Sequence, residues 1–298
     1  MITVVVPAFD AWTTLPAVME SLRLQVDRPD RELVLVESSG VEEARTLEEL
    51  WPWARVIRLS ERMLPGAARN LAVAQARGDL IAFIDADAVP EPDWLDQLER
   101  GLGPGEDAVA GAVLNGTPSS AVGTAGYLLE FAEWLPARPG LPRHGATCNL
   151  LIRRSALEHA GGFPPELWPG EDTVVTIPIA GRGRLAFAPD ARVRHFNRTH
   201  FTDFLRHQLR LGSSFSDVCA RVPFPDGEWG RLPRAPLSGV LRIPWLWRRL
   251  RDWSALPDGQ RAFWPAFCVG ACTWGVGLTT GALRRSLKRR SSSERAGA

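Results

Sequence analysis

Two carboxylates stand at the end of an apolar run in the segment DLIAFIDADAVP. Leu80 to Ile84 is predicted to be a strand buried on both faces, so Asp85 and Asp87 fall at its carboxyl end, where open α/β sheets bind ligands. Two acids beside a buried strand repel each other and lose hydration unless a positive group neutralises them. A hard divalent cation with a diphosphate meets that need. The alternative is helix capping, because Pro90 to Asp93 is typical of a helix start.

A second pair of acids, Glu171 and Asp172, follows Trp168-Pro169-Gly170 at the predicted start of another helix. Carboxylates there lie near the positive end of the helix dipole. On the residues alone, a helix cap accounts for this pair as well as a catalytic role does.

Strands and helical patterns alternate in the first part of the chain, which predicts a parallel, doubly wound sheet. The predicted strands before the acidic strand are Ile2 to Pro7, Glu32 to Glu37 and Arg55 to Leu59, with helices over about 13–26 and 41–51 between them.

Three loops are therefore expected to converge on one edge of this sheet. The first carries Pro7, Ala8 and Phe9, the second carries Glu37, and the third is the loop with the paired aspartates. A nucleotide site needs such convergence, because base, ribose and diphosphate spread along a crevice.

Pro65 begins a predicted helix that runs to about Arg77 and leads into the acidic strand. Its amino-terminal amides together with Arg69 predict an anion site, with Gly66 and Asn70 beside it. Ordinary helix packing is the alternative interpretation for the glycine and the alanines.

Strands and helices are also predicted in the second half of the chain. The predicted elements are a strand at Asp107 to Leu114, a helix at Tyr127 to Trp134, a loop at Pro136 to Arg143, a strand at Thr147 to Arg153, two strands at Arg184 to Ala188 and Ala191 to His195, and a helix at Thr202 to Cys219.

Composition excludes several classes of function. The 298 residues, 45% apolar, can bury one large core or two small ones. A net charge of +1 provides no global field for nucleic acid, which is not an expected partner. Lys288 is the only lysine, which argues against P-loop, pyridoxal phosphate and lysine aldolase chemistry. The four cysteines lack Cys-x-x-Cys spacing and are expected to be reduced, and no secretory leader is recognisable, so the first domain is expected to fold in the cytoplasm.

The composition changes after Pro223 to a linker and two apolar stretches, Val240 to Trp253 and Ala262 to Leu283. The first mixes tryptophan with arginine, as interfacial helices do, and the second carries no charge over a length that can span a bilayer. A basic end follows from Arg284. We expect a tail anchored to or apposed to the cytoplasmic face of the membrane; the alternative is a soluble helical extension.

The runs VVVPAF, LVE and PGAARNLAVAQARGDLIAFIDAD together resemble the inverting family 2 glycosyltransferases of the GT-A fold, over roughly two thirds of the chain. The resemblance implies an α/β fold with a Rossmann-like mixed sheet flanked by helices. It implies a catalytic domain over 1–222, with a nucleotide-sugar half (1–112) and an acceptor half (113–222). A linker and helical tail over 223–298 would follow.

The resemblance also implies roles for the residues that match the family's motifs. The base would be held by Pro7, Ala8, Phe9 and Glu37, and the nucleotide would lie by Gly66, Arg69 and Asn70. Asp85 would contact the ribose, and Mg²⁺ or Mn²⁺ would be bound by Asp87 and His195. The general base would be Asp172, supported by Glu171. UDP is the nucleotide expected first. Because Glu37 replaces the family's usual aspartate with a longer side chain, GDP and dTDP stay as alternatives.

The activity implied is transfer of a hexosyl group, with inversion, from a nucleotide-diphospho-sugar to a glycan or lipid-linked acceptor in cell-envelope or glycolipid polysaccharide synthesis. The family's processive motif is absent, so one sugar per encounter is expected. Two alternatives remain at this point: a nucleotidyltransferase, and a non-catalytic membrane-associated protein that binds nucleotide or glycan on the same fold.

Overall fold

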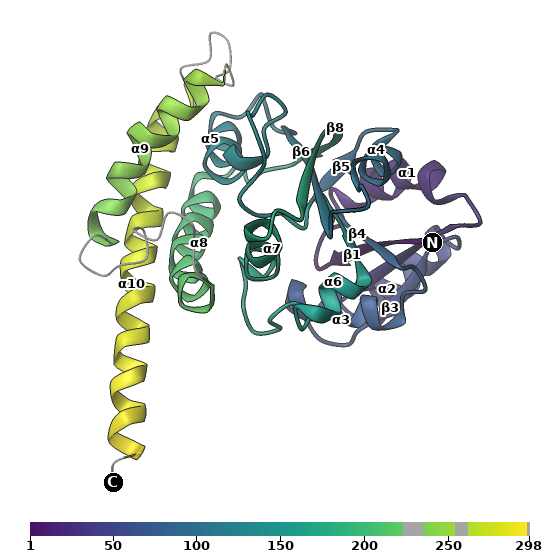
Figure 1. The fold of residues 1–298 in the computed structure, drawn as a ribbon, viewed down its shortest axis with the longest axis horizontal. Coiled ribbons are helices and arrows are strands. Elements are labelled where there is room, and N and C mark those ends of the chain that lie inside the picture. Colours follow the sequence, from purple (N-terminus) through teal and green to yellow (C-terminus); the bar gives the residue numbers. More distant parts are fainter. Residues whose placement is uncertain (223–234, 254–261, 297–298) are drawn as a thin grey trace. The chain divides into compact units, whose positions relative to one another are not determined.

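The structure, a computed structural model, describes residues 1–222, 235–253 and 262–296 and consists of two compact units (Figure 1). The first comprises residues 1–116 and 133–196, and the second comprises residues 117–132 and 197–298. The units do not part at residue 222, where the composition changes. A division into a catalytic domain and a tail therefore stays a prediction.

The first unit is built on one mixed sheet of eight strands, in the order β3-β2-β1-β4-β7-β6-β8-β5. The strands are β1 (Ile2–Ala8), β2 (Arg31–Glu37), β3 (Arg55–Arg58), β4 (Leu80–Phe83), β5 (Ala88–Pro90), β6 (Ala108–Asn115), β7 (Leu150–Arg153) and β8 (Leu185–His195). The neighbours β3, β2, β1 and β4 are parallel, whereas β7 is antiparallel to both β4 and β6. The carboxyl ends of β1, β2 and β4 therefore meet at one edge, as the sequence predicts.

Helices flank this sheet (Figure 1), and α1, α3 and α4 bury apolar residues. They are α1 (Leu15–Val26), α2 (Val41–Leu50), α3 (Pro65–Gln75), α4 (Trp94–Gly101), α6 (Arg154–His159) and α7 (Glu171–Gly181). The apolar residues of α1 from Leu15 to Leu22, at three- and four-residue spacing, are buried. The central strands have apolar side chains on both faces, because both faces are covered.

Two features of the sheet differ from the sequence prediction. The two strands expected between Arg184 and His195 are one strand, β8, whose pairing with β6 shifts register between Gly111 and Ala112. In addition, Ala88–Pro90 forms β5, which pairs with the end of β8 and was not predicted. Buried Asn149 stabilises the irregular pairing, because its side-chain amide donates to the carbonyl oxygens of Ala112 (2.9 Å) and Ala191 (2.8 Å).

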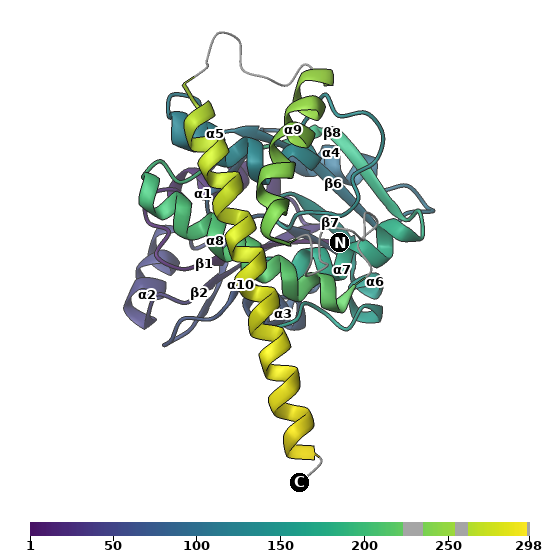
Figure 2. The same ribbon diagram turned by 90° about the vertical axis from the view of Figure 1, so that its left-hand side faces the viewer.

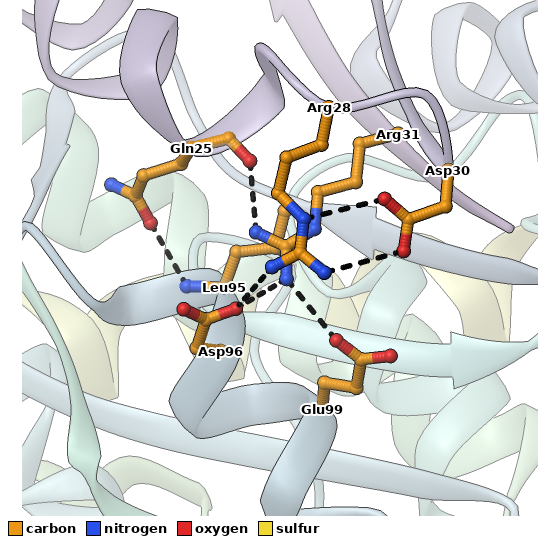
Figure 3. A network of polar contacts seen from close by, with 7 residues as sticks. All are labelled: Gln25, Arg28, Asp30, Arg31, Leu95, Asp96 and Glu99. Carbon is orange, nitrogen blue, oxygen red and sulfur yellow. Dashed lines mark hydrogen bonds and ion pairs between the residues drawn. The ribbon is translucent and has the colours of Figure 1, made fainter.

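A buried arginine connects α1, β2 and α4 (Figure 3). Arg31 donates to the carbonyl oxygen of Gln25 at 2.8 Å, to Asp96, and to Glu99 at 3.1 Å. The Gln25 side-chain oxygen accepts from the Leu95 amide at 2.9 Å. These bonds satisfy backbone groups where α1 ends and α4 begins, so Arg31 joins three elements that approach from different parts of the chain.

Arg31→Ala is expected to lower the free energy of unfolding by about 3 kcal/mol, because it leaves the buried Gln25 carbonyl without its donor and removes an ion-pair partner from Asp96 and Glu99. The hydrogen bond from Arg31 lowers the pKa of Asp96, so this contribution is present at neutral pH and lost as the pH falls through that lowered pKa. Denaturant unfolding at several pH values measures both effects. Arg28→Ala, at a half-exposed neighbour in the same network, is the control and should cost under about 1 kcal/mol; equal losses would contradict the assignment.

The second unit is helical. Its elements are α5 (Ala121–Glu130), α8 (Phe201–Arg221), α9 (Ala235–Asp252) and α10 (Trp264–Ala296), and α10 packs against the other three. A short 3₁₀ turn, Ala132–Trp134, follows α5 in the chain, so the helix expected over Tyr127 to Trp134 begins and ends earlier than predicted.

Glycines allow the backbones of α10 and its neighbours to approach closely. A methyl group at Gly212 of α8 would lie 1.9 Å from the carbonyl oxygen of Trp274, and one at Gly277 would lie 2.1 Å from that of Leu209. One helix among the described residues, Trp264–Lys288, is long and apolar enough to cross a membrane, and 56% of its most apolar window is buried within the protein. Most of the predicted linker, residues 223–234, lies outside the described residues.

Candidate active site

The two aspartates at the end of β4 lie beside His195, the last residue of β8. Oxygen atoms of Asp85 and Asp87 and a ring nitrogen of His195 all lie within 4.8 Å of one another. The pairing of β5 with β8 causes this, because Ala88 lies opposite His195 and so places Asp87 next to it. The Thr14 hydroxyl fixes the intervening residue by donating to the Ala86 carbonyl oxygen at 2.7 Å.

These three side chains fit a divalent cation. Carboxylate oxygens are the ligands that Mg²⁺ and Mn²⁺ prefer, and a histidine nitrogen suits Mn²⁺ as an additional ligand. His195 is buried, with its Nε2 atom 3.4 Å from an oxygen of Asp87, whereas Asp87 keeps 40% of its side chain exposed. The arrangement leaves an open side from which a ligand can approach.

Buried Arg69, in the first turns of α3, joins the two acidic clusters that the sequence predicts. Its guanidinium donates to Asp85 at 2.6 Å and to Glu171 at 2.5 Å. Burial alone would lower the pKa of Arg69, but the negative charges of Asp85 and Glu171 outweigh it and raise that pKa. The guanidinium is therefore a fixed positive charge.

Glu171 is buried at the start of α7, whereas the neighbouring Asp172 is partly exposed. Burial raises the pKa of Glu171 to about 7, and the charge of Asp172 adds to this shift while Arg69 opposes it. An acid enclosed in this way positions Arg69 rather than meeting a substrate.

Asp172 is held by groups from two segments. One carboxylate oxygen accepts from the backbone amide of Thr147 at 3.2 Å, and the other accepts from the amide of Thr173 at 2.6 Å and from its hydroxyl at 3.2 Å. Thr176, one turn further along α7, donates through its hydroxyl to the carbonyl of Asp172 at 2.7 Å. The carboxylate is therefore fixed in orientation while remaining accessible.

Cys148 shows that the two acidic clusters lie around one place in the first unit. Burial raises the pKa of its thiol strongly, and the charges of Asp85, Asp172 and Asp87 raise it further while Arg69 opposes them. The thiol stays protonated at neutral pH and is no candidate nucleophile. The charges of both acidic clusters therefore act on this one buried thiol.

The loops after β1 and β2 are joined by hydrogen bonds. The Ser38 amide and hydroxyl both donate to the carbonyl oxygen of Ala8 at 3.1 Å, and the Ser39 hydroxyl accepts from the Asp10 amide at 2.7 Å. The carboxylate of Glu37 is buried and accepts from the amide of Ser39 at 2.6 Å. Glu37 therefore stabilises the turn after β2 through this hydrogen bond, at the end of the strand that pairs with Pro7 and Ala8.

Gly66 and Asn70 of α3 lie against the segment that precedes α7. Gly66 packs against Phe163 and Pro164, with the Glu171 side chain also in contact range. Asn70 donates to the Phe163 carbonyl at 2.7 Å and accepts from the Phe163 amide at 2.9 Å. Both residues therefore contact the segment that leads into α7, the helix that begins with Glu171 and Asp172.

Arg62, which sequence reasoning missed, lies between two aromatic rings at this edge. Its guanidinium carbon is 4.4 Å from the centre of the Phe9 ring and 5.6 Å from that of Trp168. It is exposed and makes no ion pair with any residue that the structure describes. The loop before α3 carries no motif, so the only available signal was its position between β3 and that helix.

His144 was also missed as part of the site. Its Nδ1 atom is 3.5 Å from the Thr173 hydroxyl, and its ring packs edge-on against Trp134 with centroids 4.8 Å apart. Burial lowers the pKa of His144, although Asp172 and Glu133 oppose the shift. A neutral imidazole thus packs beside the Asp172 segment, directly after the loop predicted over Pro136 to Arg143, to which the sequence assigns no role.

Residues 3–161 match the family model described as Glycosyl transferase family 2. Among curated relatives, Glycosyltransferase AglE of Haloferax volcanii is 27% identical over 264 residues, covering 81% of this chain and 85% of that protein. Succinoglycan biosynthesis protein ExoM of Rhizobium meliloti is 31% identical over 165 residues, covering 51% of this chain and 52% of that protein.

Among solved structures, the fold is similar to that of the mannosyltransferase PcManGT from Pyrobaculum calidifontis in complex with GDP-Man and Mn²⁺. The TM-score is 0.63 at 18% identity, over 95% of this chain and 86% of that one. This likeness confirms the GT-A fold that the sequence motifs indicate.

Proposed function

The chain belongs to glycosyl transferase family 2, and we propose that it transfers a hexosyl group with inversion from a nucleotide-diphospho-sugar to an acceptor hydroxyl. The observation that carries this proposal is the pair of bonds from Arg69, to Asp85 at 2.6 Å and to Glu171 at 2.5 Å, which joins the acids after β4 to the start of α7, where Asp172 lies. A reaction that separates a sugar from a diphosphate needs positive charge on one side and a proton acceptor on the other.

On the donor side, Asp87 and His195 would hold Mn²⁺ or Mg²⁺, with Asp85 at the ribose. When bound, the cation supplies positive charge that stabilises the leaving diphosphate. The mannosyltransferase with the similar fold binds Mn²⁺ together with GDP-Man, which supports Mn²⁺ as the first ion to test. Arg69 holds Asp85 in place and adds a fixed positive charge behind it.

The base of the nucleotide would lie against Pro7, Ala8 and Phe9, beside the turn that follows Glu37. Phe9 is 43% exposed, so its ring is available for stacking, and Arg62 lies on it. UDP remains the nucleotide expected first, with GDP or dTDP as alternatives because Glu37 has a longer side chain than the aspartate usual in the family.

On the acceptor side, Asp172 would be the general base. The acceptor oxygen forms a bond to the anomeric carbon, its proton passes to a carboxylate oxygen of Asp172, and the bond from that carbon to the diphosphate oxygen breaks with its electron pair on the diphosphate. Attack from the side opposite the leaving group inverts the anomeric centre. Glu171 is buried and paired with Arg69, so it acts as a positioning residue.

The acceptor would be a glycan or a lipid-linked sugar in cell-envelope or glycolipid polysaccharide synthesis, used at the cytoplasmic face of the membrane. The similarity to a succinoglycan biosynthesis protein supports a polysaccharide acceptor. The apolar and basic carboxyl-terminal helices support a location near lipid.

Slow hydrolysis of the donor, with water as acceptor, tests the reaction without knowledge of the natural acceptor. Purified protein with Mn²⁺ and a panel of α-linked UDP-, GDP- and dTDP-sugars would be followed by ¹H NMR of the newly released sugar. The proposal predicts that the β-anomer is released first. Release of the α-anomer would contradict inversion, and nucleotide binding without turnover across acceptor panels would favour a binding protein.

Arg62→Ala is expected to raise the KM for the donor roughly tenfold and leave kcat nearly unchanged, because the guanidinium stacks on Phe9 and would face the nucleotide rather than the reacting atoms. Arg62→Lys keeps the charge but loses the planar group and should be intermediate. Arg45→Ala, at an exposed arginine of α2, is the matched control. A fall in kcat at unchanged KM would contradict the assignment.

A further inference from the structure

Helices α9 and α10 carry two stripes of exposed apolar side chains. Within each stripe the main spacings are three, four or seven residues, so the stripe occupies one side of its helix. The large exposed members, between 36% and 66% accessible, are Leu237, Val240, Leu241 and Trp247 on α9 and Val269, Val276, Leu283 and Leu287 on α10. A soluble surface rarely collects this many large apolar groups on two adjacent helices, so the face requires an explanation.

The other sides of α10 are committed to packing within the second unit. Gly277 and Gly281 meet the backbone of α8, and Gly275 meets the backbone of Gly239 in α9. Figure 2 shows α9 and α10 side by side, with α10 crossing in front of α8. The glycines that weaken α10 as a membrane span are thus used for close helix packing, whereas the hydroxyls of Thr273, Thr279 and Thr280 donate to carbonyl oxygens of α10 itself. One stripe of α10 faces outward.

Basic residues flank the apolar face at both ends. The two helices run antiparallel, because Trp247 packs on Trp264 with ring centroids 4.6 Å apart and Gly239 lies against Gly275. Exposed Arg248 and Arg251 therefore lie near the start of α10, while Arg284 and Lys288 lie toward its far end. In sequence, the two helices hold ten basic residues against two acids.

We propose that the outer face of α9 and α10 lies flat on an anionic lipid surface, so that the protein is held on one leaflet and does not span the bilayer. Apolar side chains between basic ends are complementary to acyl chains beneath anionic headgroups, and tryptophan favours that interface. A second copy docked on the same face would place basic ends against basic ends. This inference rests on the membrane location included in the proposed function and specifies how it is achieved.

The test is flotation of the purified full chain with vesicles of phosphatidylcholine alone or mixed with phosphatidylglycerol. Wild type is expected to float with the anionic vesicles, to be released by raised salt, and to be extracted by alkaline carbonate. The double variant Val240→Asp/Val276→Asp should lower partitioning by at least about tenfold. The matched control, Leu24→Asp/Val41→Asp, changes exposed apolar residues of α1 and α2 and should partition as wild type does.

Three outcomes would overturn the inference: no binding to anionic vesicles, retention through carbonate extraction, or a concentration-dependent dimer that the patch variant abolishes. Mn²⁺-dependent nucleotide binding, measured on the same proteins, reports separately on the transferase. Absence of vesicle binding with intact nucleotide binding would refute the lipid surface alone. Vesicle binding without Mn²⁺-dependent nucleotide binding would refute the transferase alone.

Discussion

Asp172→Asn is expected to lower kcat by about 10³-fold while nucleotide binding is retained. The asparagine keeps the shape of the side chain, and its carbonyl oxygen can still accept one of the hydrogen bonds that Thr147 and Thr173 donate to the carboxylate. The amide cannot accept the proton of the acceptor hydroxyl, so the chemical step loses its base. Single-turnover kinetics with saturating donor, alongside nucleotide titration, separates the two effects.

Asp190→Asn is the matched control for this variant. Asp190 lies on β8 with 66% of its side chain exposed and pairs only locally, with Arg192 among the described residues, so its loss of charge should leave kcat unchanged. Full activity of Asp172→Asn would show that another group accepts the proton. Loss of nucleotide binding would show that Asp172 belongs to the donor side.

Asp87→Ala is expected to lower kcat/KM by about 10³-fold and to remove the dependence of turnover on Mn²⁺. Asp87 and His195 are brought together by the pairing of β5 with β8, so one ligand of a set already shaped by the fold would be missing. Turnover measured across a Mn²⁺ series tests this. Asp93 is an exposed acid six residues further along the chain, and Asp93→Ala should retain the Mn²⁺ response of wild type. An unchanged Mn²⁺ response in Asp87→Ala would exclude Asp87 as a ligand.

The placement of Asp85 and Asp87 could be predicted from the sequence because it depends on local rules. An apolar strand buried on both faces ends at Phe83, and acids directly after it must lie at the sheet edge. The start of α7 at Glu171 was predicted for the same reason, because glycine followed by acids indicates a helix beginning.

Long-range partners could not be predicted in this way. The sequence indicates that Arg69 is near an anion, but not that it bridges Asp85 and Glu171, residues that are far apart in the chain. His195 depends on the register between β5 and β8, and β5 is too short to recognise by pattern. Arg62 lies in a loop whose path is set by tertiary packing rather than by propensity.

Composition alone does not decide whether α10 spans a membrane or packs within the protein. An uncharged run over 262–283 predicts a membrane span and an internal packing helix equally well, since both are apolar. The distinction lies in what the glycines contact. Gly212, Gly239 and Gly277 each meet a neighbouring backbone, which assigns most sides of α10 to the protein and leaves one stripe for a partner.

The central claim is that Asp87, His195 and the loops at the ends of β1 and β2 form a metal-dependent site for a nucleoside diphosphate. Thermal unfolding of the purified chain with UDP, GDP, dTDP and CDP, each with and without Mn²⁺, measures this directly, because a ligand that binds only the folded state raises the unfolding midpoint. The account predicts a rise with one of these nucleotides that requires Mn²⁺ and is absent in Asp87→Ala. No rise with any nucleotide, or an equal rise without Mn²⁺, would contradict it.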